Sequence, residues 1–193
     1  MISAILLAAG ESKRMGQPKL LLPWGNITVI AHVISVFSNA GIKDILVVTG
    51  GAQESVEAVV KQSAIRSIHN DNYATGEMLS SLQCGLHAMS SEVQAVLIGL
   101  GDQPQVKAGS VRLICHAFRK SKAKLVVPSF QMRRGHPWLV ARPLWDELLE
   151  MKSPESPRDF LNKFAREIHY VDAGTSSILA DMDTPEDYQK SLP

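Results

Sequence analysis

The sequence predicts an α/β fold of three layers, α/β/α, built on a mostly parallel mixed sheet with a Rossmann-like first half. Two observations lead to this prediction. Four short runs are rich in Val, Ile and Leu and do not alternate with polar residues, which is typical of strands covered on both faces. These runs are residues 2–8, 44–49, 65–69 and 93–100. Helical patterns separate them at 28–39, 53–62 and 79–89, and this alternation produces right-handed crossovers and parallel strands.

The second half of the chain has a less regular pattern after Asp102. Its predicted elements are a helix at 110–121, a strand at 124–128, a hairpin or bent strand pair around Gly135, a helix starting near Pro157, a strand at 167–171 and a short last helix. Proline is tolerated in a first helical turn, which places the start at Pro157. The last helix is entered at Thr184, because threonine is a good N-cap and Pro185 fits the first helical position.

Composition indicates an ordinary globular protein with one domain, residues 1–193. The chain is 45% hydrophobic and 20% charged, and a net charge of +1 argues against a molecule built as a whole to bind polyanions. Nucleic-acid binding is not expected, since the clustered basic surface and aromatic platforms are missing. No apolar run approaches the ~20 residues of a membrane helix, and residues 1–9 lack the basic region of a signal peptide. Cys84 and Cys115 fit no metal or disulfide pattern, which favours a cytoplasmic location.

A glycine-punctuated basic loop follows the first predicted strand, in the segment LLAAGESKRMGQPKLLLPW. Ligands of open α/β sheets bind at the carboxyl ends of strands, and the loop begins at such an end. Gly10 can adopt positive φ and lets a ligand approach the backbone, while Arg14 and Lys19 supply positive charge. The loop has no G-x-G-x-x-G motif, and the spacing from Gly10 to Gly16 is one residue too long for a P-loop. From the residues alone, both a basic surface loop and a polyphosphate-binding loop stay open.

Two acidic motifs occur in the chain. In VLIGLGDQP, Asp102 follows a buried run and is either a turn residue or a ligand-binding acid at the same sheet edge. In DMDTPEDY, Asp181 and Asp183 are two apart, so an extended backbone directs them to the same side. Mg²⁺ usually takes one or two protein carboxylates and completes its shell with phosphates and water. Asp102 and one acid of the second motif would therefore suffice.

Two further segments carry candidate site residues. In NYATGEMLSSLQCGL, Gly76 precedes a predicted helix whose first turns include Ser81, either as ordinary first-turn polarity or as part of a binding site. In RRGHPWL, Arg134 and His136 flank Gly135, either at a solvated hairpin tip or at an anion site. His136 has the ordinary potential of histidine to titrate near neutral pH.

The first segment resembles the signature L-A-A-G-x-S-x-R-M-G-x-x-K-x-L-L of nucleotidyltransferases with a glycosyltransferase-A-like fold. More narrowly, it is similar to the molybdenum cofactor cytidylyltransferases and their MobA-like relatives. This resemblance implies an Mg²⁺-dependent enzyme that transfers CMP from CTP to the phosphate of molybdopterin and releases pyrophosphate. It also implies a nucleotide-binding half, 1–104, and an acceptor-binding half, 105–193. A molybdenum hydroxylase would be the client of the product.

The resemblance also implies roles for individual residues. The implied nucleotide-binding residues are Leu7, Ala8, Ala9, Gly10, Arg14, Lys19, Gly76, Ser81 and Asp102. Arg14, Lys19 and Asp102 would carry catalysis. Asp102 and Asp183 would bind the metal, with Asp181 as second choice for the latter. The acceptor would contact Arg134, Gly135, His136 and Pro137.

Ala9 bears on the choice of nucleotide. Relatives that use GTP tend to read L-A-G-G in this loop and those that use CTP read L-A-A-G, as here. The additional methyl group narrows the base slot and disfavours a purine. Two alternatives remain: a nucleotidyltransferase acting on a sugar or polyol phosphate, and a non-catalytic assembly protein for the molybdenum cofactor of a hydroxylase.

Overall fold

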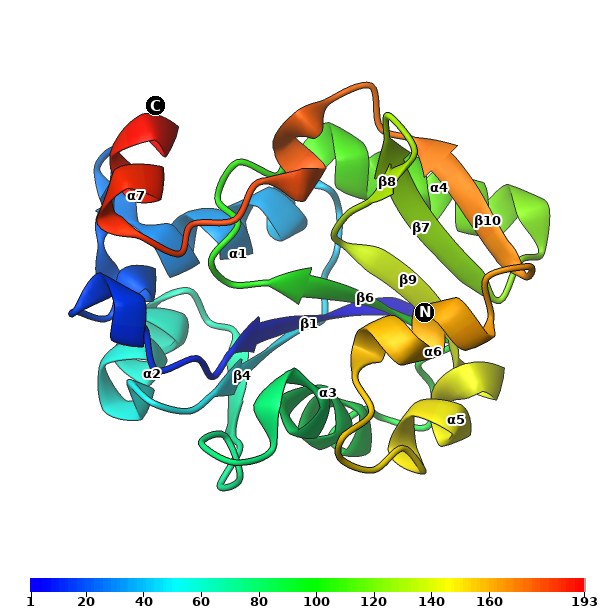
Figure 1. Cartoon of the computed structure of the whole chain (residues 1–193), viewed down its shortest axis with the longest axis horizontal. Coiled ribbons are helices and arrows are strands. Elements are labelled where there is room, and N and C mark those ends of the chain that lie inside the picture. The colour runs from blue at the N-terminus through cyan, green and yellow to red at the C-terminus, as the bar shows by residue number, and fades with distance from the viewer. Residues whose placement is uncertain (193) are drawn as a thin grey trace.

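The computed structural model describes residues 1–192, which form three layers with one central sheet (Figure 1). The eight-stranded sheet has the order β10-β7-β9-β6-β1-β4-β5, with β8 paired to β7. Its strands are β1 (Ile2–Ala8), β4 (Ile45–Thr49), β5 (Arg66–His69), β6 (Ala95–Leu100), β7 (Leu125–Phe130), β8 (Arg133–Arg134), β9 (Trp138–Ala141) and β10 (Ile168–Asp172). β1, β4, β5 and β6 are parallel, as are β7 and β10, whereas β9 is antiparallel to both β6 and β7. The predicted three-layer fold with a mostly parallel mixed sheet is confirmed.

Helices cover both faces of the sheet. They are α1 (Val29–Asn39), α2 (Gln53–Gln62), α3 (Glu77–His87), α4 (Ala108–Ser121), α5 (Trp145–Leu149), α6 (Pro157–Lys163) and α7 (Pro185–Ser191). Apolar side chains of α1, α2 and α4 pack on one face of the sheet, and those of α3, α5 and α6 pack on the other. No helix within residues 1–192 is long and apolar enough to cross a membrane.

β1 shows why its sequence does not alternate. Leu6 and Ala8 belong to the core with α1, α2 and α4, while Ile5 and Leu7 belong to the core with α3, α5 and α6. Successive strand side chains point to opposite faces, so a strand between two helical layers is apolar at nearly every position, and the one exception in β1 is the small, fully buried Ser3. Burial on both sides therefore accounts for the run 2–8, whose predicted bounds match β1.

Three short elements were not predicted, and the turn of one predicted hairpin lies elsewhere. A small ribbon, β2 (Pro23–Trp24) and β3 (Ile27–Thr28), and the five-residue α5 were not predicted. A hairpin or bent strand pair was expected around Gly135. The hairpin turn, from β7 to β8, lies instead at Gln131 and Met132, which both have positive φ, and Gly135 stands between β8 and β9. Gly135 is instead needed for close packing, because a Cβ there would lie 2.4 Å from the carbonyl oxygen of Ile178.

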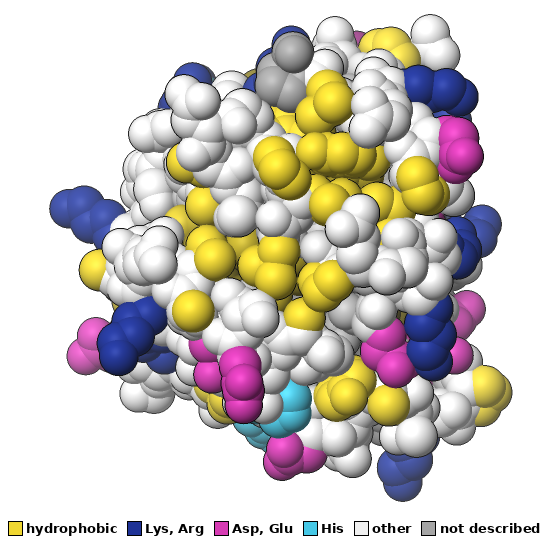
Figure 2. Space-filling view, turned by 90° about the vertical axis from the view of Figure 1, so that its left-hand side faces the viewer, with side chains coloured by type: hydrophobic (Ala, Val, Ile, Leu, Met, Phe, Trp, Pro, Cys, Tyr) yellow, Lys and Arg dark blue, Asp and Glu magenta, His cyan; other side chains and the backbone are white. Residues whose placement is uncertain are grey.

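The C-terminal tail runs back to the loop that follows β1. Met182 is fully buried in a small core with Met15, Leu22, Trp24 and Val29, and the hydroxyl of Tyr188 donates to the carbonyl of Pro23 at 2.7 Å. Figure 2, which faces the side of α7 in Figure 1, shows apolar side chains gathered in the middle of this surface. These contacts place the acidic segment before α7 beside the residues that follow β1.

The sheet extends from β1 in two directions, toward β4 and β5 on one side and toward β6 on the other. In open α/β sheets, ligands bind outside the carboxyl ends of the strands where the order reverses. The loops after β1 and β6 both open at this edge (Figure 1). The fold therefore brings residues 9–19, Asp102 and the tail together.

Candidate functional site

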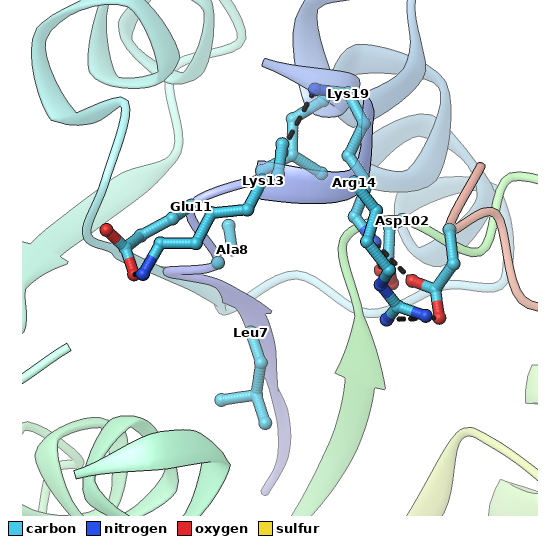
Figure 3. Close-up of a pocket in the computed structure, with 11 residues that line it drawn as sticks. Leu7, Ala8, Glu11, Lys13, Arg14, Lys19 and Asp102 are labelled. Atoms are coloured by element: carbon cyan, nitrogen blue, oxygen red, sulfur yellow. Dashed lines mark hydrogen bonds and ion pairs between the residues drawn. The ribbon is translucent and has the colours of Figure 1, made fainter. Parts of the chain in front are cut away.

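The loop after β1 folds back on itself through two left-handed residues. Ser12 has φ 55° and Gly16 has φ 67°, whereas Gly10, which could adopt a positive φ, does not do so. The backbone N–H of Lys19 donates to the hydroxyl oxygen of Ser12 at 3.1 Å, and Met15 anchors the loop in the small core. This arrangement turns Arg14 and Lys19 toward the end of β6 (Figure 3).

Four charged side chains from three chain segments meet beside this loop. The Lys19 ammonium lies 2.5 Å from Oδ2 of Asp102 and 2.8 Å from Oδ1 of Asp183. The guanidinium of Arg14 lies 2.8 Å from Oδ2 of Asp183. Lys13 points away from them and pairs with Glu11 at 2.7 Å, with 78% of its side chain exposed (Figure 3). Only 12% of the Lys19 side chain is exposed, so the two lysines of the loop lie in very different surroundings.

Lys19 and Asp183 keep their charges at neutral pH. Burial by itself would lower the pKa of Lys19, but the neighbouring carboxylates of Asp102 and Asp183 outweigh it and raise this pKa above its usual value. The hydrogen bond from Lys19 lowers the pKa of Asp183, and the charges of Lys19 and Arg14 add to the effect against partial burial. Lys19 is therefore cationic and Asp183 anionic across the physiological range.

A cavity of about 240 Å³ adjoins the cluster. Its lining includes Leu7, Ala8, Gly10, Arg14, Lys19, Asp102 and Asp183. A Cβ on Gly10 would meet no atom within 4 Å, so this glycine leaves its side of the loop open. The cavity thus combines apolar strand residues, an open backbone and three cations, of which Lys13 is mostly exposed and paired with Glu11 at the rim. This combination suits a ligand with a hydrophobic part and a polyanionic part.

The predicted metal site passes a test of its donors. Oxygen atoms of Asp102 and Asp183 approach one point from two segments, since both lie within 2.8 Å of the same ammonium nitrogen. Carboxylate oxygens are the ligands that Mg²⁺ and Mn²⁺ prefer, and two of them suffice when phosphates complete the shell. No group of three or more His, Cys, Asp or Glu within residues 1–192 could form a closed metal site. The donor set therefore fits a hard divalent cation shared with a phosphorylated ligand.

Asp181 does not join this pair of carboxylates. Its Oδ1 accepts a hydrogen bond from Nε2 of Gln103 at 3.0 Å, one residue beyond Asp102. Asp183, the first choice from the sequence, is the acid of this segment that meets Lys19 and Arg14.

Three predicted nucleotide-binding residues lie outside the 240 Å³ cavity. Ala9 is 8% exposed, and its carbonyl accepts from the N–H of Gly51 at 3.2 Å. Ser81 is buried in α3, where its hydroxyl accepts from Nδ2 of Asn70 at 3.0 Å. Gly76 precedes α3, and a Cβ there would lie 2.4 Å from Ser80, so close packing alone accounts for this glycine.

A second cavity of about 1010 Å³ lies against the start of α3, β8, α6 and β10. Arg134, Gly135 and His136 line it, as predicted for the acceptor side, whereas Pro137 is buried behind them. Trp138 lies behind this lining, where it is 1% exposed and stacks on Phe160, and the exposed aromatic ring at the cavity is that of Tyr170. Positive charge at this cavity comes from Arg133, Arg134 and Arg158, opposed by Glu77 and Glu155.

Two neighbours orient the guanidinium of Arg134. Its Nε donates to the hydroxyl of Tyr170 at 2.9 Å, and its Nη1 donates to Oδ1 of Asn162 at 2.8 Å. His136 differs from the sequence-based expectation of titration near neutral pH. Burial lowers its pKa to about 4, against an opposing effect of Asp181, so the imidazole is neutral at pH 7.

Comparison with known proteins assigns the family. Residues 4–169 match the sequence profile of the MobA-like NTP transferase domain. The chain belongs to the MobA-like NTP transferase family.

This MobA-like protein is similar to several known proteins over nearly its full length. It is 30% identical to the molybdenum cofactor cytidylyltransferase of Escherichia coli over 97% of its own length and 93% of the relative. It is 26% identical to the nicotine blue oxidoreductase of Paenarthrobacter nicotinovorans, over 99% of its own length and 96% of the relative. The crystal structure of Rv0371c from Mycobacterium tuberculosis matches with a TM-score of 0.86 at 26% identity, over 99% of this chain and 97% of Rv0371c. Another structure of Rv0371c is a complex with manganese. The resemblance read from the loop sequence is confirmed.

Sequence reasoning missed some site residues of this MobA-like protein. Asn162 and Tyr170 reach Arg134 only because β10 pairs with β7, and no local motif announces that pairing. Gln103, by contrast, stands within the motif G-D-Q-P. A search for the hydrogen-bond partner of this polar residue beside Asp102 would have drawn attention to it.

Proposed function

We propose that this MobA-like NTP transferase moves CMP from CTP to the terminal phosphate of molybdopterin, in its molybdenum-loaded form, and releases pyrophosphate. The convergence of Asp102 and Asp183 on Lys19, with Arg14 alongside, is the observation that carries the proposal. Two carboxylates and two cations at one sheet edge match what transfer between two phosphorylated molecules requires. The identity with a molybdenum cofactor cytidylyltransferase supports the finer assignment.

The reaction needs positioning more than proton transfer. An oxygen of the acceptor phosphate attacks the α-phosphorus of CTP in line, and the bond from that phosphorus to pyrophosphate breaks. A phosphomonoester has a second pKa of about 6, so the nucleophile is already anionic at neutral pH. The neutral His136 has no base role to perform, and the reaction requires no nucleophilic Ser or Cys.

Arg14 and Lys19 would bind the β- and γ-phosphates of CTP and stabilise the charge that develops on the leaving pyrophosphate. Asp102 and Asp183 would hold a divalent cation, Mg²⁺ in our proposal, which supplies charge neutralisation at the phosphates when it is bound. Leu7, Ala8 and Gly10 would contact the nucleoside from the strand end. Ala9 would narrow the base slot, and Gly76 and Ser81 would border it at the N-terminal end of α3.

The second cavity would bind the acceptor. Its aromatic wall at Tyr170, whose ring is exposed, suits a flat ring system, and Arg134, held by Tyr170 and Asn162, suits an attached anion. A sugar or polyol phosphate would use the cations without needing the aromatic wall. For this reason we favour a phosphorylated pterin.

The test is pyrophosphate release by purified protein with Mg²⁺, each of the four NTPs and molybdenum-loaded molybdopterin. We expect release with CTP, loss of release in Asp102→Asn, and full release in Asp146→Asn, an exposed acid of α5 away from the site. Absence of release with every NTP would refute the enzymatic role. Release only with a sugar or polyol phosphate as acceptor would refute the pterin assignment.

A further inference from the structure

Asp102 and Asp183 stand on two loops that no strand pairing connects. In this structure Lys19 and Arg14 hold them together. Under the proposed function, however, these cations turn to the phosphates of the nucleotide. The spacing of the two carboxylates then needs another restraint, one that does not depend on the nucleotide-binding cations.

One hydrogen bond connects the same two loops outside the cluster. Nε2 of Gln103 donates to Oδ1 of Asp181 at 3.0 Å, across 78 residues of sequence. Gln103 directly follows Asp102, and Asp181 precedes Asp183 by two residues. The bond therefore joins the two segments one short step from the proposed metal ligands.

The tail transmits this restraint along a short extended segment. Ala180 and Thr184 both have extended backbones, and the fully buried Met182 points into the small core. Side chains of an extended segment alternate, so Asp181 and Asp183 lie on the side opposite Met182. Once Met182 is packed and Asp181 is bonded, Asp183 has little freedom to move away from Asp102.

The other end of the bond is equally well held. Gln103 is 3% exposed, and the N–H of the neighbouring Gly101 donates to the carbonyl of Leu7 at 2.9 Å. The second amide atom of Gln103, Oε1, is buried and has no hydrogen-bond partner within residues 1–192. A buried polar group with one unmet partner stabilises a fold poorly compared with an apolar side chain of similar size. The presence of Gln103 is therefore better explained by the connection that it makes to Asp181 than by a contribution to the free energy of unfolding.

Asp181 also faces the acceptor side. Its charge acts on the neutral imidazole of His136, and the N–H of His136 donates to the carbonyl of Ile178 at 3.0 Å in the same tail. The carboxylate thus stands between the loop of Asp102 and the loop that lines the second cavity. This location suits a positioning role for Asp181, whose Oδ1 already accepts the hydrogen bond from Gln103.

We propose that Gln103 and Asp181 form a positioning pair that sets the spacing between Asp102 and Asp183, and that Asp181 is not itself a metal ligand. The proposal rests on the proposed function, from which it takes the metal site. Groups that orient metal ligands typically change metal affinity by about 10- to 100-fold when they are removed.

The experiment measures Mn²⁺ binding to the full chain with CTP present, by electron paramagnetic resonance of free Mn²⁺, together with thermal unfolding. Gln103→Leu and Asp181→Ala should each weaken Mn²⁺ binding about tenfold. Asp181→Asn should stay within about twofold of wild type, because the amide oxygen of asparagine still accepts from Gln103. The double variant Gln103→Leu with Asp181→Ala should bind no more weakly than either single variant, since both remove the same bond.

Three results would overturn the pairing. If Asp181→Asn weakens Mn²⁺ binding as much as Asp181→Ala does, the carboxylate charge itself is needed and Asp181 is a metal ligand. Additive losses in the double variant, or a lower unfolding temperature with unchanged Mn²⁺ affinity, would reduce the pair to a structural contact. If Gln103→Leu does not fold, the two Asp181 variants still decide, because that side chain is exposed. Absence of Mn²⁺ binding in wild type, or unchanged binding in Asp102→Asn, would instead refute the metal site and the proposed function with it.

Discussion

The ammonium group of Lys19 lies 2.8 Å from a carboxylate oxygen of Asp183, although 164 residues separate the two in sequence. The contact joins the loop after β1 to the tail before α7, and Asp102 approaches the same ammonium from the end of β6. A site assembled from three distant segments needs the complete fold, and its parts act together. The predictions below examine the parts one at a time.

Lys19→Met should lower kcat/KM for pyrophosphate release by about 100-fold or more, because a buried cation facing the leaving phosphates is lost. Lys13→Met is the matched control: it removes a lysine of the same loop that is exposed and paired with Glu11. The control should retain activity within about threefold, in line with small effects of exposed ion pairs. Equal losses in both variants would contradict a special role for Lys19.

Ala9→Gly should shift nucleotide preference from CTP toward GTP by about tenfold in the ratio of kcat/KM values, since one methyl group narrows the base slot. Ala64→Gly is the control: it removes a methyl group from an exposed residue that lines neither cavity, and it should leave the ratio unchanged. An unchanged ratio in Ala9→Gly would eliminate the steric account of base choice.

Arg134→Met should raise the KM for the acceptor about tenfold while the KM for CTP stays within about twofold, because this guanidinium belongs to the second cavity. Arg166→Met, at an exposed residue outside that lining, is the control. Steady-state kinetics with each substrate varied in turn provides the measurement. A rise in the KM for CTP alone would show that Arg134 contacts CTP and not the acceptor.

His136 should make folding stability fall in mild acid. Its pKa is about 4 in the folded protein and about 6.5 when unfolded, so the unfolded chain binds the proton first. Stability is then independent of His136 above pH 6.5 and falls as the pH drops toward 4, by at most about 3 kcal/mol. Urea unfolding at pH 7 and pH 4.5 should show a smaller loss in His136→Asn than in wild type. The exposed His116→Asn should behave as wild type, and equal losses in all three proteins would show that His136 is not buried in its neutral form.

Much of the fold could be predicted because its elements are set locally. The bounds of β1 and α2, and the start of α6 at Pro157, match their predictions, since continuous apolar runs, helical periodicity and proline at a first turn act over a few residues. The turn before β8 could not be placed, because Gln131 and Met132 adopt positive φ without glycine. Glycine is common in turns, so the hairpin was placed at Gly135. The structure requires glycine there for another purpose, which is close contact with Ile178, far along the chain.

The site divides in the same way. Arg14, Lys19 and Asp102 stand in motifs that mark them within short segments. Asp183 could be ranked above Asp181 only through the resemblance to related transferases, because the residues alone left both acids open. The bond from Gln103 to Asp181 depends on the packing of Met182, which no local pattern reports. Long-range contacts of this kind require the coordinates.

The most direct measurement uses CTP with radioactive phosphorus at either the α- or the γ-position and follows the label during reaction with molybdenum-loaded molybdopterin. Our account predicts that phosphorus from the α-position enters a dinucleotide with the pterin, that phosphorus from the γ-position appears in pyrophosphate, and that Asp102→Asn forms neither product. Label from the α-position that remains in free CMP, or γ-phosphorus released as inorganic phosphate, would contradict nucleotidyl transfer to the pterin.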